Sequence, residues 1–132
     1  MSLISATDLT KVYGSGDTAV TALDHVSLQV EPGEFVAVMG PSGCGKSTLL
    51  HLLGGLDRPT GGSVTIDGQT LSNLSDAKLT ELRRHKIGFI FQFFNLIPVL
   101  NAVENAALPV TLDGVSQAEA KERAKPWLAR FG

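Results

Sequence analysis

The sequence predicts an α/β domain with a parallel sheet at its core. Short apolar runs alternate along the chain with stretches of helical periodicity, which is the order of elements in such domains. The run Phe35–Met39 is uniformly apolar and partly β-branched, as is typical of a strand buried on both faces of a parallel sheet. A Gly-rich loop and a helical pattern follow this run directly, so the chain contains a strand–loop–helix unit.

The elements before the Gly-rich loop are predicted to be strands. Leu3–Leu9 is a short, largely apolar run, and His25–Val30 alternates apolar and polar residues with the period of a half-buried strand. Glu31–Glu34 contains adjacent Pro and Gly and predicts a turn into the strand Phe35–Met39. Beyond the loop, Lys46–Leu53 is predicted to be a helix that ends at a pair of glycines.

Two further strands are predicted in the middle of the chain. Residues 57–62 are rich in Pro and Gly and predict a loop. Ser63–Ile66 predicts a short strand that ends in the turn pair Asp67–Gly68. Ile87–Phe91 is apolar and is the next candidate for a buried strand.

Helices are predicted to begin after three residues whose side chains can act as N-caps, namely Ser75, Asn101 and Ser116. A Glu stands three residues after Asn101 and after Ser116, which is the spacing of a capping box. Pro126 is expected to kink or restart the last helix, because proline cannot donate a backbone hydrogen bond. The predicted helices reach from Ser75 to about His85 and cover 102–108 and 117–131.

Composition and charge exclude several classes of protein. The chain has 132 residues, of which 43% are hydrophobic and 18% charged, so it fits one folded domain and not a disordered tail. Its net charge of −2 provides no basic field, and no nucleic-acid partner is expected. Cys44 is the single cysteine, which excludes an internal disulfide. The longest apolar stretch, Ile87–Leu100, contains polar residues and is shorter than the roughly 18 residues of a membrane span.

The Gly-rich loop fits the phosphate-binding pattern G-x-x-x-x-G-K-[ST]. Its glycines allow a tight turn in which successive backbone N–H groups point at an anion, and the following helix aims its positive end at the same place. Lys46 is expected to reach the β- and γ-phosphates of a nucleotide, and the Ser47 hydroxyl to ligate Mg²⁺. A chain of this composition would contain the pattern by chance about once in a hundred times. The loop reads Gly40-Pro41-Ser42-Gly43-Cys44-Gly45-Lys46-Ser47, with Thr48 following.

The segments around this loop narrow the class of P-loop protein. Lys11-Val12-Tyr13-Gly14 precedes the loop, Leu49–Gly62 follows it, and Ile87–Gln92 leads into Asn95–Pro98. In this order the segments closely resemble the ATP-binding subunits of ABC transporters, and most of all the branch that serves lipoprotein release and macrolide-type export. The resemblance covers nearly the whole chain. It implies a P-loop NTPase fold with a parallel-sheet nucleotide-binding core and an N-terminal antiparallel β portion.

The resemblance also implies roles for individual residues. Tyr13 matches the aromatic residue whose ring stacks on adenine, and the loop 40–48 matches the one that holds the phosphates of ATP. Gln92 matches the glutamine that contacts Mg²⁺ and the attacking water. The expected catalytic residues are therefore Lys46 and Gln92, and the expected Mg²⁺ contacts are Ser47 and Gln92.

The segment after Gln92 is expected to meet a membrane partner. Residues 93–104 match the surface that grips the coupling helix of a transmembrane permease subunit. Four of the six phenylalanines crowd into this neighbourhood, and strand alternation would leave some of them facing outward; they are Phe89, Phe91, Phe93 and Phe94. The resemblance further implies a dimer of ATP-binding subunits, located in the cytoplasm on the inner face of the cell membrane.

Several parts of the family pattern do not occur in this sequence: a Leu-Ser-Gly-Gly-Gln-like signature, an apolar strand leading into Asp-Glu, and a switch histidine after a later strand. We therefore expect residues 1–132 to be the N-terminal part of an ABC ATPase domain, with the phosphate loop at 40–48, a glutamine-loop region at 92–104 and the C-terminal part absent. Alone, the chain is expected to bind Mg-ATP but hardly to hydrolyse it, because the catalytic carboxylate is among the missing parts.

Two other hypotheses remain open from the sequence. One is a naturally short nucleotide-binding module without catalytic activity. The other is a P-loop kinase or a small GTPase. A GTPase would carry Asp-x-x-Gly and Asn-Lys-x-Asp, and neither occurs; a kinase would need an Arg-rich lid, for which Arg83-Arg84 is thin support.

Overall fold

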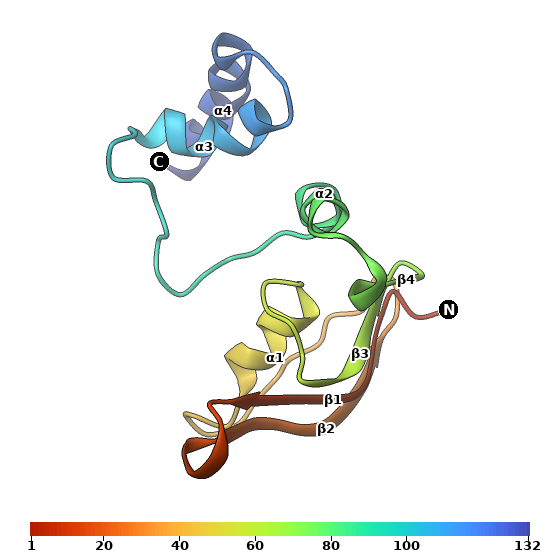
Figure 1. Ribbon diagram of the computed structural model, residues 1–132. Helices are drawn as coiled ribbons and strands as arrows, with labels where there is room; N and C mark the ends of the chain where they lie inside the picture. Colours follow the sequence, from red (N-terminus) through yellow and green to blue (C-terminus); the bar gives the residue numbers. More distant parts are fainter. The chain divides into compact units, whose positions relative to one another are not determined.

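The chain forms two units, and the computed structural model describes all of its residues, 1–132. The first unit, Met1–Ile87, contains a β-sheet with two α-helices, and the second, Gly88–Gly132, contains a pair of helices (Figure 1). Each unit has its own cluster of buried apolar side chains. No helix in either unit has the length and apolar character needed to cross a membrane.

The sheet of the first unit is antiparallel throughout, with the strand order β2-β1-β3-β4. β1 lies in its interior, so that Ile4 pairs with Val30 on one side and with Ile66 on the other. Asp67 and Gly68 both have positive φ, as a two-residue hairpin turn between β3 and β4 requires. The strands are β1 (Ile4–Tyr13), β2 (Val20–Val30), β3 (Gly61–Ile66) and β4 (Gln69–Thr70).

The core of the first unit joins the sheet to α1 (Lys46–Leu53) and α2 (Asp76–Lys86). Leu9 of β1 and Leu52 of α1 are its most deeply buried large side chains. Ser75 caps α2 by accepting a hydrogen bond from the Lys78 backbone N–H, as predicted. The remaining buried members are Ala6, Leu23, Leu49, Val64, Ile66, Leu71, Leu79 and Leu82.

The second unit consists of α3 (Ala102–Leu112) and α4 (Gln117–Phe131), which pack through small residues. Ala107, Ala120 and Ala124 are buried between them, and both hydrogen bonds of the predicted capping box at Asn101 are formed. Pro126 does not restart the last helix, because α4 is one continuous helix through this position, and the expected kink stays a prediction. Proline removes its own N–H bond and crowds the carbonyl four residues earlier, and the helix continues through it while Ala120 and Ala124, in the preceding turns, pack against α3.

Two of the strands expected for the parallel core are not formed in this structure. Phe35–Met39 and Ile87–Phe91 have neither helical nor strand structure, and Phe35 is 96% exposed. A buried strand needs hydrogen-bonding neighbours, and neither segment pairs with any strand of the sheet β2-β1-β3-β4. The α/β class and the antiparallel portion are confirmed, whereas the parallel core does not assemble from these residues alone.

Candidate nucleotide-binding site

The phosphate loop enters α1 as the sequence predicts. Gly43 and Gly45 both have positive φ, and the Cys44 backbone N–H donates to the Pro41 carbonyl at 3.3 Å, which closes a tight turn. α1 begins at Lys46, and no side chain caps its first turn. The N–H groups of this turn therefore remain available to an anion, together with the positive end of the helix dipole.

Glycine is required at Gly45, and a side chain at Gly40 would displace that of Cys44, because the chain approaches itself closely at both positions. A Cβ on Gly45 would lie 2.4 Å from the carbonyl oxygen of Ala22 in β2, so the loop rests directly on this strand. A Cβ on Gly40 would lie 2.6 Å from Cys44 Sγ. The first contact places the end of the loop against the sheet, and the second brings the two ends of the loop together.

Lys46 lies across the loop. Its Nζ donates to the carbonyl oxygens of Gly40 at 2.7 Å and Pro41 at 2.8 Å, and lies 3.6 Å from Cys44 Sγ. The ammonium group and the first turn of α1 thus place positive charge at one point. Phosphate oxygens are the ligands that this arrangement suits best.

A magnesium ion fits the oxygen donors at this point. Ser47 is exposed in the first turn of α1, where its hydroxyl follows the lysine directly, while Thr48 is half-buried. Mg²⁺ in nucleotide sites keeps several waters and is held largely by substrate phosphates, so the Ser47 hydroxyl would be one ligand among these. No group of three or more His, Cys, Asp or Glu side chains forms a separate metal site.

The structure brings Tyr13 into the same region as the phosphate loop. Tyr13 is the last residue of β1 and is 44% exposed, and the adjacent Val12 pairs with Thr21 of β2. The loop contacts the next residues of β2, because Gly45 lies against Ala22. Gln92 belongs to the second unit, in the segment between α2 and α3, so its expected place beside the loop stays a prediction.

Two residues that sequence reasoning missed lie against Tyr13. Asp57 Oδ2 accepts a hydrogen bond from the Tyr13 hydroxyl at 3.2 Å, and Lys11 Nζ lies 5.0 Å from the centre of the tyrosine ring. Lys11 and Asp57 also form an ion pair at 3.1 Å. Because 46 residues separate them in the sequence, no local spacing signals this contact.

The electrostatics of this cluster favour an ionised Asp57. The backbone N–H of Arg58 donates to its carboxylate at 2.8 Å and is the main cause that holds the pKa of Asp57 below its usual value. Burial of the carboxylate opposes this effect, whereas the hydrogen bonds and charge of Lys11 and the hydroxyl of Tyr13 reinforce it. Asp57 therefore carries its charge at neutral pH.

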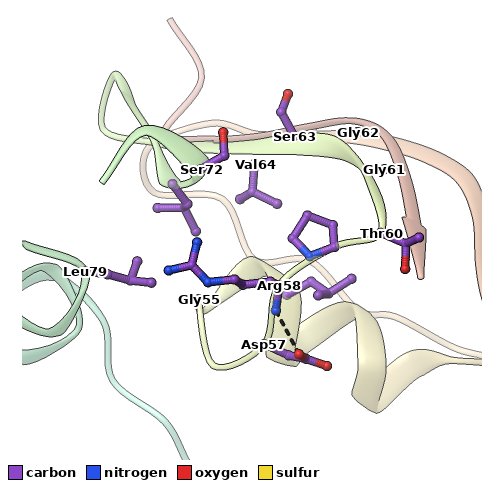
Figure 2. A pocket seen from close by; sticks show the side chains of 13 residues that line it. Gly55, Asp57, Arg58, Thr60, Gly61, Gly62, Ser63, Val64, Ser72 and Leu79 are labelled. Carbon is purple, nitrogen blue, oxygen red and sulfur yellow. Dashed lines mark hydrogen bonds between the residues drawn. The ribbon is translucent and has the colours of Figure 1, made fainter. Parts of the chain in front are cut away.

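A pocket of about 170 Å³ lies on the other side of this segment. Figure 2 shows the carboxylate of Asp57 and the guanidinium of Arg58 pointing in opposite directions. The guanidinium donates to Asp76 of α2 at 2.6 Å, so it does not compete with Lys11 for Asp57. The lining is mainly Leu52, Val64, Leu71, Leu79 and the segment 57–63, and includes no residue of the phosphate loop.

Comparison with known proteins places this site in a family. Residues 23–132 match the family model described as ABC transporter, which is most of the chain and includes the whole phosphate loop. The chain belongs to the ABC transporter family. Its resemblance to this family, inferred above from the order of its motifs, is thereby confirmed.

The relatives of this ABC transporter chain include proteins of both branches named above. A macrolide export ATP-binding/permease protein, MacB, of Hyphomonas neptunium is 52% identical over 98% of the chain. A lipoprotein-releasing system ATP-binding protein, LolD, of Geobacter metallireducens is 47% identical over 99% of the chain. The chain spans 20% of the length of the first protein and 58% of the second.

Solved structures confirm the fold class. The MJ0796 cassette of Methanocaldococcus jannaschii, in a dimeric post-hydrolysis state bound to ADP and Pi, matches with a TM-score of 0.86 at 46% identity. The match covers 93% of this chain and 54% of the cassette. A second dimeric structure of that cassette matches with a TM-score of 0.84.

Proposed function

We propose that this chain is part of the ATP-binding subunit of an ABC transporter, in which ATP binding and hydrolysis drive export or lipoprotein release by a membrane partner. The observation that carries the proposal is that Lys46 lies across the loop that leads into the uncapped first turn of α1. Membership of the ABC transporter family and the similarity to export and lipoprotein-releasing proteins support the transport role.

In this proposal each residue of the site has one task. The backbone N–H groups of the loop and the ammonium of Lys46 bind the β- and γ-phosphates, and Lys46 exchanges its two carbonyl partners for phosphate oxygens. Ser47 holds Mg²⁺, which neutralises phosphate charge when bound. Tyr13 stacks on the base, and Gln92 contacts Mg²⁺ and orients the attacking water.

We further propose that residues 1–132 alone bind Mg-ATP but hydrolyse it negligibly. Phosphoryl transfer needs a positioned water and charge neutralisation at the γ-phosphate as well as bound phosphates. Within this stretch neither the signature motif nor the strand leading into Asp-Glu occurs. In the full-length form a dimer of such subunits is expected to complete the site, in keeping with the dimeric state of the similar solved cassettes.

The membrane partner is proposed to dock on the segment that follows Gln92. Phe93 is 75% exposed and Phe94 is 91% exposed, so this segment presents apolar side chains that a protein partner can cover. The expected partner is the transmembrane permease subunit, which places this chain in the cytoplasm on the inner face of the cell membrane.

Isothermal titration with Mg-ATP tests the proposed function. Lys46→Ala removes the ammonium that spans the loop and is expected to weaken binding at least about tenfold, because a charge-assisted contact to phosphate is lost. Lys78→Ala removes a lysine of α2 instead and is the matched control, with unchanged affinity expected. Equal affinity of the Lys46→Ala chain and the original chain would overturn the proposal, provided that their circular dichroism spectra agree.

A further inference from the structure

We infer that Lys11 and Asp57 are positioning residues that orient the ring of Tyr13 for the base of the nucleotide. The inference rests on the proposed function, since it concerns how the base is received once the loop holds the phosphates. It adds to that function a pair of residues outside the phosphate loop, one from β1 and one from the segment after α1.

The contacts hold the tyrosine at two points. Asp57 Oδ2 accepts from the hydroxyl of Tyr13 at 3.2 Å, while Asp57 Oδ1 accepts from Lys11 Nζ at 3.1 Å. Lys11 Nζ also donates to the carbonyl oxygen of Arg58 at 2.7 Å and lies 5.0 Å from the ring centre. One carboxylate thus binds both the ring hydroxyl and the cation that lies over the ring, which restricts rotation of the side chain.

The position of Asp57 is itself fixed to the same strand. The side-chain oxygen of Thr60 accepts from the Val12 backbone N–H at 3.0 Å, and the Thr60 backbone N–H donates to the Thr10 carbonyl at 2.9 Å. A Cβ on Gly62 would lie 2.3 Å from the Asp8 carbonyl oxygen, so the segment runs directly against β1. These contacts precede Tyr13 on β1 and hold the segment that carries Asp57 against the same strand.

The geometry leaves one face of the ring for a ligand. Lys11 lies over the other face, and its side chain is only 14% exposed. The tyrosine keeps 44% of its surface accessible, so a flat base can stack on the open side. Lys11 therefore selects the face on which stacking takes place.

The experiment compares two ligands, Mg-ATP and Mg-tripolyphosphate, which share the phosphate chain but not the base. Tyr13→Phe keeps the ring and removes the bond to Asp57, and Lys11→Met keeps the apolar stem and removes the cation. Each is expected to weaken ATP binding about 3- to 10-fold and to leave tripolyphosphate binding unchanged. Lys78→Met, on α2, is the matched control and should change neither affinity.

A spectroscopic measurement separates orientation from general weakening. Tyr13 is the single tyrosine of the chain, so fluorotyrosine labelling gives one ¹⁹F signal. We expect this signal to shift in the Lys11→Met chain, and in the original chain to shift with Mg-ATP but not with Mg-tripolyphosphate.

Three results distinguish failure of the positioning role from failure of the proposed function. If Tyr13→Phe and Lys11→Met bind ATP as the original chain does, the positioning role is wrong, and the proposed function stands as long as Lys46→Ala loses both ligands. Should Lys11→Met weaken both ligands equally, the lysine acts on the phosphates by charge and the inference fails for it. If Lys46→Ala changes neither affinity, the proposed function itself fails.

Discussion

Gly45 shows how a single residue places the phosphate loop. Its φ of +98° lies in the left-handed region, and its α-carbon faces the carbonyl oxygen of Ala22 with no room for a side chain. The residue therefore meets two requirements at once, one of backbone conformation and one of close approach to β2. These two requirements also determine the position of Lys46, which is the next residue.

Gly45→Ala is accordingly expected to lower the free energy of unfolding of the first unit by more than about 2 kcal/mol. Gly33→Ala is the matched control, because Gly33 also has a positive φ but a Cβ there would meet nothing within 4 Å. Its cost should be the backbone term alone, about 1 kcal/mol. Urea unfolding followed by circular dichroism measures both, and equal losses would contradict the close approach.

The charge of Asp57 makes the first unit sensitive to acid. A carboxyl whose pKa is lowered by folding stabilises the folded state above its unfolded pKa, and this contribution is lost as the pH falls through the folded pKa. The ordinary value is 3.8, so stability should begin to fall as the pH approaches 4 from above. The Asp57→Asn chain should lose less stability over this range in urea titrations at a series of pH values. Parallel curves for the two chains would show that Asp57 is not linked to folding.

At the scale of elements, local signals were predictable and distant pairings were not. Helix starts at Ser75, Asn101 and Ser116 depend on contacts within three residues, and all three are confirmed. The phosphate loop is likewise a run of consecutive residues. Lys11 and Asp57, which form an ion pair, are 46 residues apart in the sequence. Phe35–Met39 pairs with no strand of the sheet, which the composition of this run alone does not reveal.

The capping box of α3 gives a prediction for the second unit. Asn101→Ala removes the acceptor of the Glu104 backbone N–H and should destabilise this unit by about 1 kcal/mol. Asn101→Ser is the control and should cost little, because serine caps nearly as well as asparagine. Trp127, the single tryptophan, lies in α4, so its fluorescence reports unfolding of this unit. A serine variant as unstable as the alanine variant would argue against capping as the cause.

At the scale of the whole molecule, the apolar segments outside the two cores determine behaviour in solution. Phe35, Met39, Ile90 and Phe94 are each more than four-fifths exposed, and they lie in segments without strand partners. Unpaired apolar chain of this kind associates readily.

Residues 1–132 are therefore expected to associate as their concentration rises, which sedimentation velocity measures. Phe35→Lys and Ile90→Lys should each shift the distribution toward the monomer, because a charge in an exposed apolar segment opposes association. Val20→Lys replaces an exposed apolar residue that lies within the sheet instead, and it should leave the distribution unchanged. A chain that stays monomeric at all concentrations would contradict this account.

The most direct test of the central claim, that residues 40–48 hold the phosphates of a nucleotide, uses Cys44. This single cysteine is exposed within the loop, so the rate at which a maleimide alkylates it reports whether the loop is covered. We expect Mg-ATP to slow alkylation in a saturable manner, Mg-tripolyphosphate to do the same, and the Lys46→Ala chain to show no protection. An alkylation rate that does not change up to millimolar Mg-ATP would contradict the claim.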